Sequence, residues 1–153
     1  MLIAPNADRF KPLAEDVRSL WMGFGQSDTV HFPKLVGLTV EDVRQHYCRM
    51  RLPFRTEVSQ PQGIMHGGAI ATAVDSVVVP AIAAHYQQRH RMSTIDLSVQ
   101  FVAPVTSDVI IEGWVTKRGR SVVFCQSEVW DTSQELVAFG TVTYKLGGPV
   151  TGS

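Results

Sequence analysis

The sequence predicts an α+β domain in which an antiparallel sheet wraps around one long central helix. Between Gly67 and Ala84 nearly every residue is small or aliphatic, which is typical of a helix that is buried on all sides. Four runs rich in β-forming residues follow this segment, at 93–102, 108–117, 121–130 and 136–145. A long antiparallel sheet needs an apolar layer over one face, and this helix is the segment able to supply it.

The 153 residues, of which 44% are hydrophobic and 18% charged, are expected to form a single domain with its core at about 35–146. Short connections join the four later runs, so we expect these strands to be antiparallel neighbours. Two weaker strand-like segments, 35–40 and 47–58, precede the central helix. Residues 41–45 between them are expected to form a turn or a short helical piece.

An amphipathic helix is expected ahead of this core, at about residues 8–24. The apolar residues from Phe10 to Trp21 recur at steps of three and four, which is the spacing of one helix face. Gly23 and Gly25 then supply a stop. The expected layout is therefore a helix, two strands, one buried helix and a series of four strands.

Charge and composition narrow the class of ligand and the compartment. Fourteen Lys and Arg residues balance fourteen Asp and Glu residues, so the chain lacks the positive field that nucleic-acid or anionic-membrane binding requires. The first residues show no signal peptide, and the central apolar segment is short for a membrane span and contains Asp75 and Pro80. Cys48 and Cys125 do not form a dense disulfide pattern, so we expect both to be reduced, in the cytoplasm.

Asp75 is the one ionisable residue of the central segment. A lone carboxylate taken out of water costs several kcal/mol unless it is paired or protonated, and such a cost suggests a use. The alternative is a structural aspartate that caps a loop or accepts a hydrogen bond from a buried backbone N–H. Ser76 has a stronger structural alternative, because a serine in a helix often bonds back to a carbonyl one turn earlier.

The start of the central segment carries Gly67 and Gly68 directly after His66. Glycines there let another group approach backbone N–H donors at the positive end of the helix dipole, which favours an oxyanion site. A tight strand-to-helix turn without a ligand is the alternative. Nine residues separate His66 from Asp75, so about half a turn of rotation points the two side chains to opposite faces. If both are catalytic, the site is shared between two chains across a two-fold axis.

Residues 63–76 have the sequence Gly-Ile-Met-His-Gly-Gly-Ala-Ile-Ala-Thr-Ala-Val-Asp-Ser. This stretch resembles the signature of hotdog-fold thioesterases of the phenylacetate-degradation type, in the 4-hydroxybenzoyl-CoA thioesterase superfamily. Residues 94–104 and 136–144 are similar to the family's strands after the helix and at the end of the domain. The similarity covers roughly residues 35–146 and leaves the N-terminal helix outside.

The resemblance implies an enzyme that hydrolyses an acyl- or aryl-CoA thioester without metal or other cofactor. It also implies a homodimer or homotetramer with active sites between subunits. By position in the signature, Asp75 matches the family's nucleophile or general base, and the Gly67 N–H matches the donor to the thioester carbonyl. His66 matches a residue that helps to position the substrate, and Thr94 falls near a Ser or Thr that assists the attacking water.

Five further residues are candidates for substrate binding. Gln60 stands where many relatives carry Asn, and it can make the same amide hydrogen bonds with a longer reach. Gly68 and Ser76, which follow Gly67 and Asp75 in the sequence, are also candidates for substrate binding. CoA carries three phosphates, so Arg91 and Arg120, from two basic clusters, are expected near the mouth of the pocket. The histidines and cysteines show no metal-ligand spacing, so no metal site is expected.

Two other functions stay open from the sequence. One is an acyl-thioester dehydratase or hydratase of the same fold, which needs a His and an acid placed on one substrate. The Gly-Gly start with an Asp in mid-helix fits hydrolysis better. The other is a non-catalytic acyl-CoA-binding module, against which the lack of an additional DNA-binding segment counts.

Overall fold

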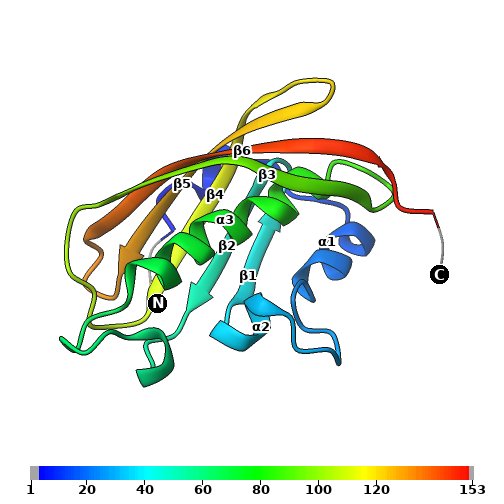
Figure 1. Ribbon diagram of the computed structural model, residues 1–153. Helices are drawn as coiled ribbons and strands as arrows, with labels where there is room; N and C mark the ends of the chain where they lie inside the picture. Colours follow the sequence, from blue (N-terminus) through cyan, green and yellow to red (C-terminus); the bar gives the residue numbers. More distant parts are fainter. Residues whose placement is uncertain (1–3, 152–153) are drawn as a thin grey trace.

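A computed structural model describes residues 4–151, which form one six-stranded antiparallel sheet curved around a long helix (Figure 1). The α-helices are α1 (Glu15–Met22), α2 (Phe32–Val36) and α3 (Gly67–Ala83), and 3-10 turns lie at Ala7–Arg9 and Thr56–Val58. The strands are β1 (Thr39–Arg44), β2 (Tyr47–Leu52), β3 (His90–Phe101), β4 (Val109–Arg118), β5 (Val122–Asp131) and β6 (Leu136–Pro149). The predicted α+β architecture is confirmed.

The strand order is β1-β2-β4-β5-β6-β3, with every neighbouring pair antiparallel. The expectation that short connections join neighbours holds for β4 with β5 and for β5 with β6. It is wrong for β3, which pairs with β6 instead of β4. The connection from β3 starts beside β6, where the Val102 N–H donates to the Val137 carbonyl at 2.9 Å. Crossing three strand spacings takes about 14 Å, which the seven residues 102–108 can span.

The N-terminal helix is shorter than the apolar spacing predicts, because α1 begins only at Glu15. Proline disfavours a helical conformation in the residue before it, and Pro12 forms a β-bridge with Arg44. Phe10 lies outside the helix, and its ring stacks on the ring of Tyr47 with a centroid distance of 5.0 Å. The prediction over about 8–24 is therefore right only for its second half.

The turn or helical piece expected at 41–45 is wrong, because nearly all of these residues lie in β1. Only the end of the strand expected at 35–40 is found, since its first residues belong to α2. A bulge between Val40 and Asp42 explains the error. The extra residue spaces the buried Val40 and Val43 three apart, so the strand lacks the alternation by which strands are recognised.

Helix α3 packs on the concave face of the sheet and supplies the centre of the core (Figure 1). The fully buried positions of α3 are Ala73, Val74, Val77, Val78, Ala81 and Ile82. The expectation of burial on all sides is nevertheless wrong along one stripe. Gly68 is exposed, and Thr72, Asp75 and Val79 are half-buried. These residues recur at steps of three and four, so they share one face of the helix, and that face is open in the single chain.

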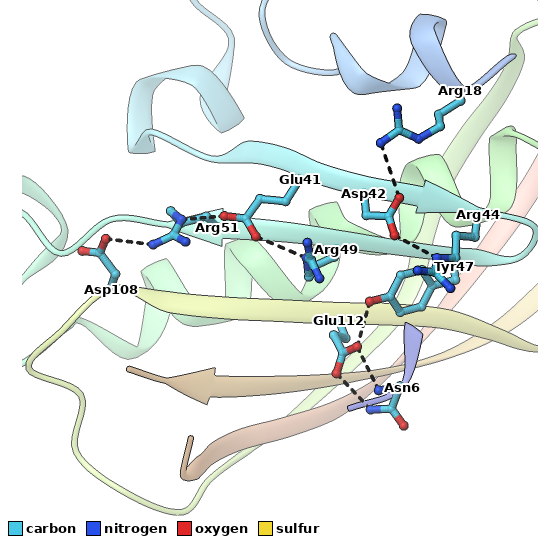
Figure 2. Close-up of polar contacts among 10 residues, drawn as sticks. All are labelled: Asn6, Arg18, Glu41, Asp42, Arg44, Tyr47, Arg49, Arg51, Asp108 and Glu112. Carbon is cyan, nitrogen blue, oxygen red and sulfur yellow. Dashed lines mark hydrogen bonds and ion pairs between the residues drawn. The ribbon is translucent and has the colours of Figure 1, made fainter. Parts of the chain in front are cut away.

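The opposite face of the sheet carries a buried carboxylate. A Cβ on Gly113 would meet Val77 of α3, so the adjacent Glu112 points away from the helix. Its side chain is 0% exposed and accepts three hydrogen bonds. The donors are the Tyr47 hydroxyl at 2.7 Å and the backbone N and Nδ2 of Asn6 at 3.1 and 3.0 Å (Figure 2). This contact fastens the N-terminal segment to the sheet.

We expect Asn6→Ala to lower the free energy of unfolding by about 1–3 kcal/mol, because a buried carboxylate would lose one of its donors. The Asn6 amide also donates to Glu128 at 2.7 Å, and the substitution removes that bond as well. The matched control is Asp8→Ala, which removes a carboxylate whose side chain is fully exposed and which pairs with Arg44 at 3.4 Å. Urea unfolding of both variants measures the effect. Equal midpoints for Asn6→Ala and the parent would show that this contact adds nothing.

Candidate active site

Asp75 lies on the open stripe of α3, and two hydroxyl groups hold its side chain. Thr94 Oγ1 donates to Asp75 Oδ1 at 2.9 Å, and the Tyr144 hydroxyl donates to the same oxygen at 3.0 Å. Within residues 4–151 no hydrogen bond reaches Oδ2, and no backbone N–H donates to this carboxylate. In the described part of the chain, Asp75 therefore neither caps a loop nor accepts a hydrogen bond from a buried backbone N–H.

Strand register brings the two hydroxyls together. Thr94 in β3 is directly opposite Tyr144 in β6, and both side chains point toward α3. Burial raises the pKa of Tyr144 above the ordinary value for a phenol, and the neighbouring Asp75 charge acts in the same direction. The phenol therefore stays protonated and able to donate.

The candidates predicted from the sequence did not include Tyr144. A signal was present, because Val142, Tyr144 and Leu146 alternate along β6 with buried side chains. An inward-facing tyrosine needs a partner for its hydroxyl.

The start of α3 has a cap and one free donor. His66 is the N-cap residue, and its Nδ1 accepts a hydrogen bond from the Gly68 N–H at 2.8 Å. A Cβ on Gly68 would lie 2.9 Å from that nitrogen, so a side chain there would displace the His66 ring that makes the cap. The Gly67 N–H has no acceptor among the described residues. Of the two predicted glycines, Gly67 therefore offers the available donor, while Gly68 completes the cap.

Three hollows lie along the first half of α3. One of about 350 Å³ is lined by Asp75, Ser76 and Leu97, together with Phe32 of α2. A second, of about 690 Å³, lies between α2 and α3 and includes His66 and Gly68. A third, of about 370 Å³, includes Gln60, Gly67 and Phe101. The hollow that holds Asp75 contains neither His66 nor Gly67, as the helical spacing predicts for a single chain.

Arg91 and Arg120 are not brought to these hollows. Arg91 is exposed on β3, and Arg120 is exposed in the turn between β4 and β5. Both lie near the far end of β6, where Gly147 approaches Arg91 and the Leu146 N–H donates to the Ser121 carbonyl. Their contact with CoA stays a prediction.

The two thiols do not offer a nucleophile. Cys48 and Cys125 are both free and buried. Burial raises the pKa of Cys125 to about 12 and also raises the pKa of Cys48. A thiol is nucleophilic as its thiolate, so neither reacts readily near neutral pH. Over residues 4–151, no three His, Cys, Asp or Glu side chains gather as a metal site, and no helix has the length and apolar character to cross a bilayer.

Comparison with known proteins places this arrangement in a family. The model of the thioesterase superfamily matches residues 62–138, which span half of the chain and include α3 and the strands from β3 to the start of β6. The chain is 27% identical over 103 residues to acyl-coenzyme A thioesterase 13 of Mus musculus. The alignment covers 65% of this chain and 71% of that protein.

Solved structures agree in fold. The thioesterase HI1161 of Haemophilus influenzae has a TM-score of 0.76 at 16% identity, covering 93% of this chain and 96% of that one. The PaaI protein of E. coli, from the phenylacetic acid degradation operon, has a TM-score of 0.70 at 16% identity, covering 78% and 86%. This chain belongs to the thioesterase superfamily and is a thioester hydrolase with the hotdog fold.

Proposed function

We propose that the protein is an acyl-CoA thioesterase that hydrolyses an acyl- or aryl-CoA thioester to the free acid and CoA, without a cofactor, in the cytoplasm. The observation that carries the proposal is the Asp75 carboxylate, which lines an open hollow and has one oxygen held by two hydroxyls, while the other oxygen has no hydrogen bond among the described residues. The similarity of this chain to proteins named acyl-coenzyme A thioesterase 13 supports CoA as the thiol.

Two routes use the same groups. As a general base, Asp75 Oδ2 takes a proton from water while the water oxygen attacks the carbonyl carbon. The carbon–sulfur bond then breaks, and the proton passes to the CoA thiolate. As a nucleophile, Oδ2 attacks the carbonyl carbon itself and expels the thiolate, and water hydrolyses the resulting anhydride. In both routes negative charge grows on the carbonyl oxygen, where the Gly67 N–H donates.

The proposed active form is a homodimer, with a homotetramer as its further assembly. β3 is an edge strand that pairs only with β6 among the described strands. Its inward residues Leu97 and Phe101 are 38% and 52% exposed, which is unusual beside a core. Open strand edges and exposed apolar side chains are surfaces that proteins tend to cover. A second copy paired through its own β3 would cover both.

The proposed site lies between the two copies. Asp75 and Gly67 are eight residues apart on α3, about 12 Å along the axis. If two α3 helices run antiparallel about a two-fold axis near Ala71, Gly67 and His66 of one chain come opposite Asp75 of the other. Ala71 is small and half-buried, so it allows the helices to approach closely.

The remaining candidate residues are assigned as substrate contacts of this shared site. Gln60 lines the same hollow as Gly67, so we assign it to the thioester, and Ser76 lines the hollow of Asp75. Arg91 and Arg120 are both exposed, and we assign them to the CoA phosphates.

Purified protein should release free thiol from at least one class among acetyl-, medium-chain, long-chain and aryl-CoA esters. A thiol reagent follows the reaction, and the class with the highest kcat/KM identifies the acyl preference. Tight binding of an acyl-CoA without thiol release would instead indicate a binding module. Conversion of an unsaturated or hydroxylated acyl-CoA without thiol release would indicate a hydratase or dehydratase.

A further inference from the structure

We propose that Tyr144 is a positioning residue that fixes the Asp75 carboxylate in its reactive orientation. The inference rests on the proposed function, because Tyr144 would act only through Asp75. Its hydroxyl lies 3.0 Å from Asp75 Oδ1 and 3.1 Å from the backbone carbonyl oxygen of the same residue. One phenol therefore contacts both the side chain and the backbone of Asp75, which restricts how the carboxylate turns relative to α3.

The two hydroxyls at Oδ1 differ in how firmly they are held. Thr94 is exposed and lies on the edge strand β3, whereas Tyr144 is 5% exposed and its strand β6 is paired on both sides. Tyr144 is therefore held more firmly than Thr94, which lies opposite it and donates the second hydrogen bond to Asp75 Oδ1. With both donors at Oδ1, rotation of the carboxylate would break two hydrogen bonds to a charged group. Oδ2, which has no hydrogen bond among the described residues, is left as the reacting oxygen.

Tyr47 provides a natural comparison on the other face of the sheet. It too is a buried tyrosine, 0% exposed, whose hydroxyl donates to a carboxylate oxygen, that of Glu112 at 2.7 Å. The Glu112 carboxylate is fully buried and lines none of the three hollows along α3. Tyr47 therefore has a structural role only, and Tyr47→Phe is a matched control for Tyr144→Phe.

We expect Tyr144→Phe to lower kcat about tenfold to a hundredfold, the factor that follows from losing one hydrogen bond to a charged group. KM should change by less than about twofold, because the phenol orients Asp75 and does not hold the substrate. Tyr47→Phe should lower the thermal midpoint and leave kcat unchanged. Steady-state kinetics and thermal unfolding of both variants, with Asp75→Asn alongside, separate the two roles.

Near-normal kcat in Tyr144→Phe, while Asp75→Asn is inactive, would overturn the positioning role and leave the proposed function intact. Normal turnover in Asp75→Asn would refute the proposed function itself. Equal losses of kcat in Tyr144→Phe and Tyr47→Phe would mean that only general stability is at work, which also overturns the proposal. If Tyr144→Phe does not fold, 3-fluorotyrosine at position 144 keeps the shape and makes the hydroxyl more acidic. A changed kcat at an unchanged thermal midpoint then supports the proposal, and an identical kcat contradicts it.

Discussion

Asp75→Asn is expected to lower kcat at least about a hundredfold while the fold and the oligomeric state are retained. The amide is nearly the same size as the carboxylate, but it can neither accept a proton from water at neutral pH nor attack a carbonyl carbon. Oδ1 of the amide can still accept hydrogen bonds from Thr94 and Tyr144, so these contacts need not change. The loss should therefore appear in the chemical step.

The matched control is Asp16→Asn, the same chemical change at an exposed position of α1, outside the edge strand β3. The Asp16 side chain makes no hydrogen bond or ion pair among the described residues. It should keep wild-type kcat. Steady-state thiol release and circular dichroism are measured for both variants. Turnover in Asp75→Asn within a few fold of wild type would remove Asp75 from the chemistry.

Local sequence patterns predicted the elements whose environment is uniform along their length. Helix α3 is small or aliphatic at nearly all of its seventeen residues, and the four strands after it carry β-forming residues bounded by turn signals, so all five were placed correctly. Asp75 was singled out because one charge in an apolar helix is costly wherever the helix packs. Thr94 donates a hydrogen bond to Asp75, and the catalytic roles of both residues stay predictions.

Most of the parts that were missed depend on contacts between residues far apart in the sequence. Tyr144 meets Asp75 because β6 lies next to β3, whereas connection length alone placed β3 beside β4. β1 was missed because its bulge spaces two buried valines like residues of a helix. The shortened N-terminal helix has a similar cause, since Phe10 packs on Tyr47, a residue of β2. A tertiary contact overrides the local pattern at Tyr144 and at the N-terminal helix, whereas a backbone bulge does so in β1.

The shared site can be tested by subunit complementation, where the largest gain of activity is expected. A chain carrying Asp75→Asn still supplies a sound carbonyl-binding half. A chain carrying Gly67→Pro lacks the backbone donor but still supplies a sound carboxylate. In a heterodimer of the two, one site receives both defects and the other receives neither. Activity should therefore reappear and approach about half of the wild-type value per dimer.

The structure makes Gly67→Pro a usable variant. Gly67 is the first residue of α3, where proline is favoured because the N–H has no helical partner. His66 before it has φ −65° and ψ 133°, an extended conformation that suits a residue preceding proline. A Cβ at Gly67 would lie 3.4 Å from the Phe101 ring, an ordinary contact distance. Gly67→Ala adds the same carbon but keeps the N–H, so it should remain largely active and serves as the matched control.

The two mutant chains are co-expressed with different tags, the heterodimer is isolated, and light scattering confirms its size before the assay. Each mutant homodimer should be nearly inactive, because every one of its sites carries a defect. If His66, Gly67 and Asp75 of one chain served one site, every site in the heterodimer would also carry a defect. Activity would then not return on mixing. A well-folded heterodimer that stays as inactive as its parents, or a fully active wild-type monomer, would show that the site belongs to a single chain.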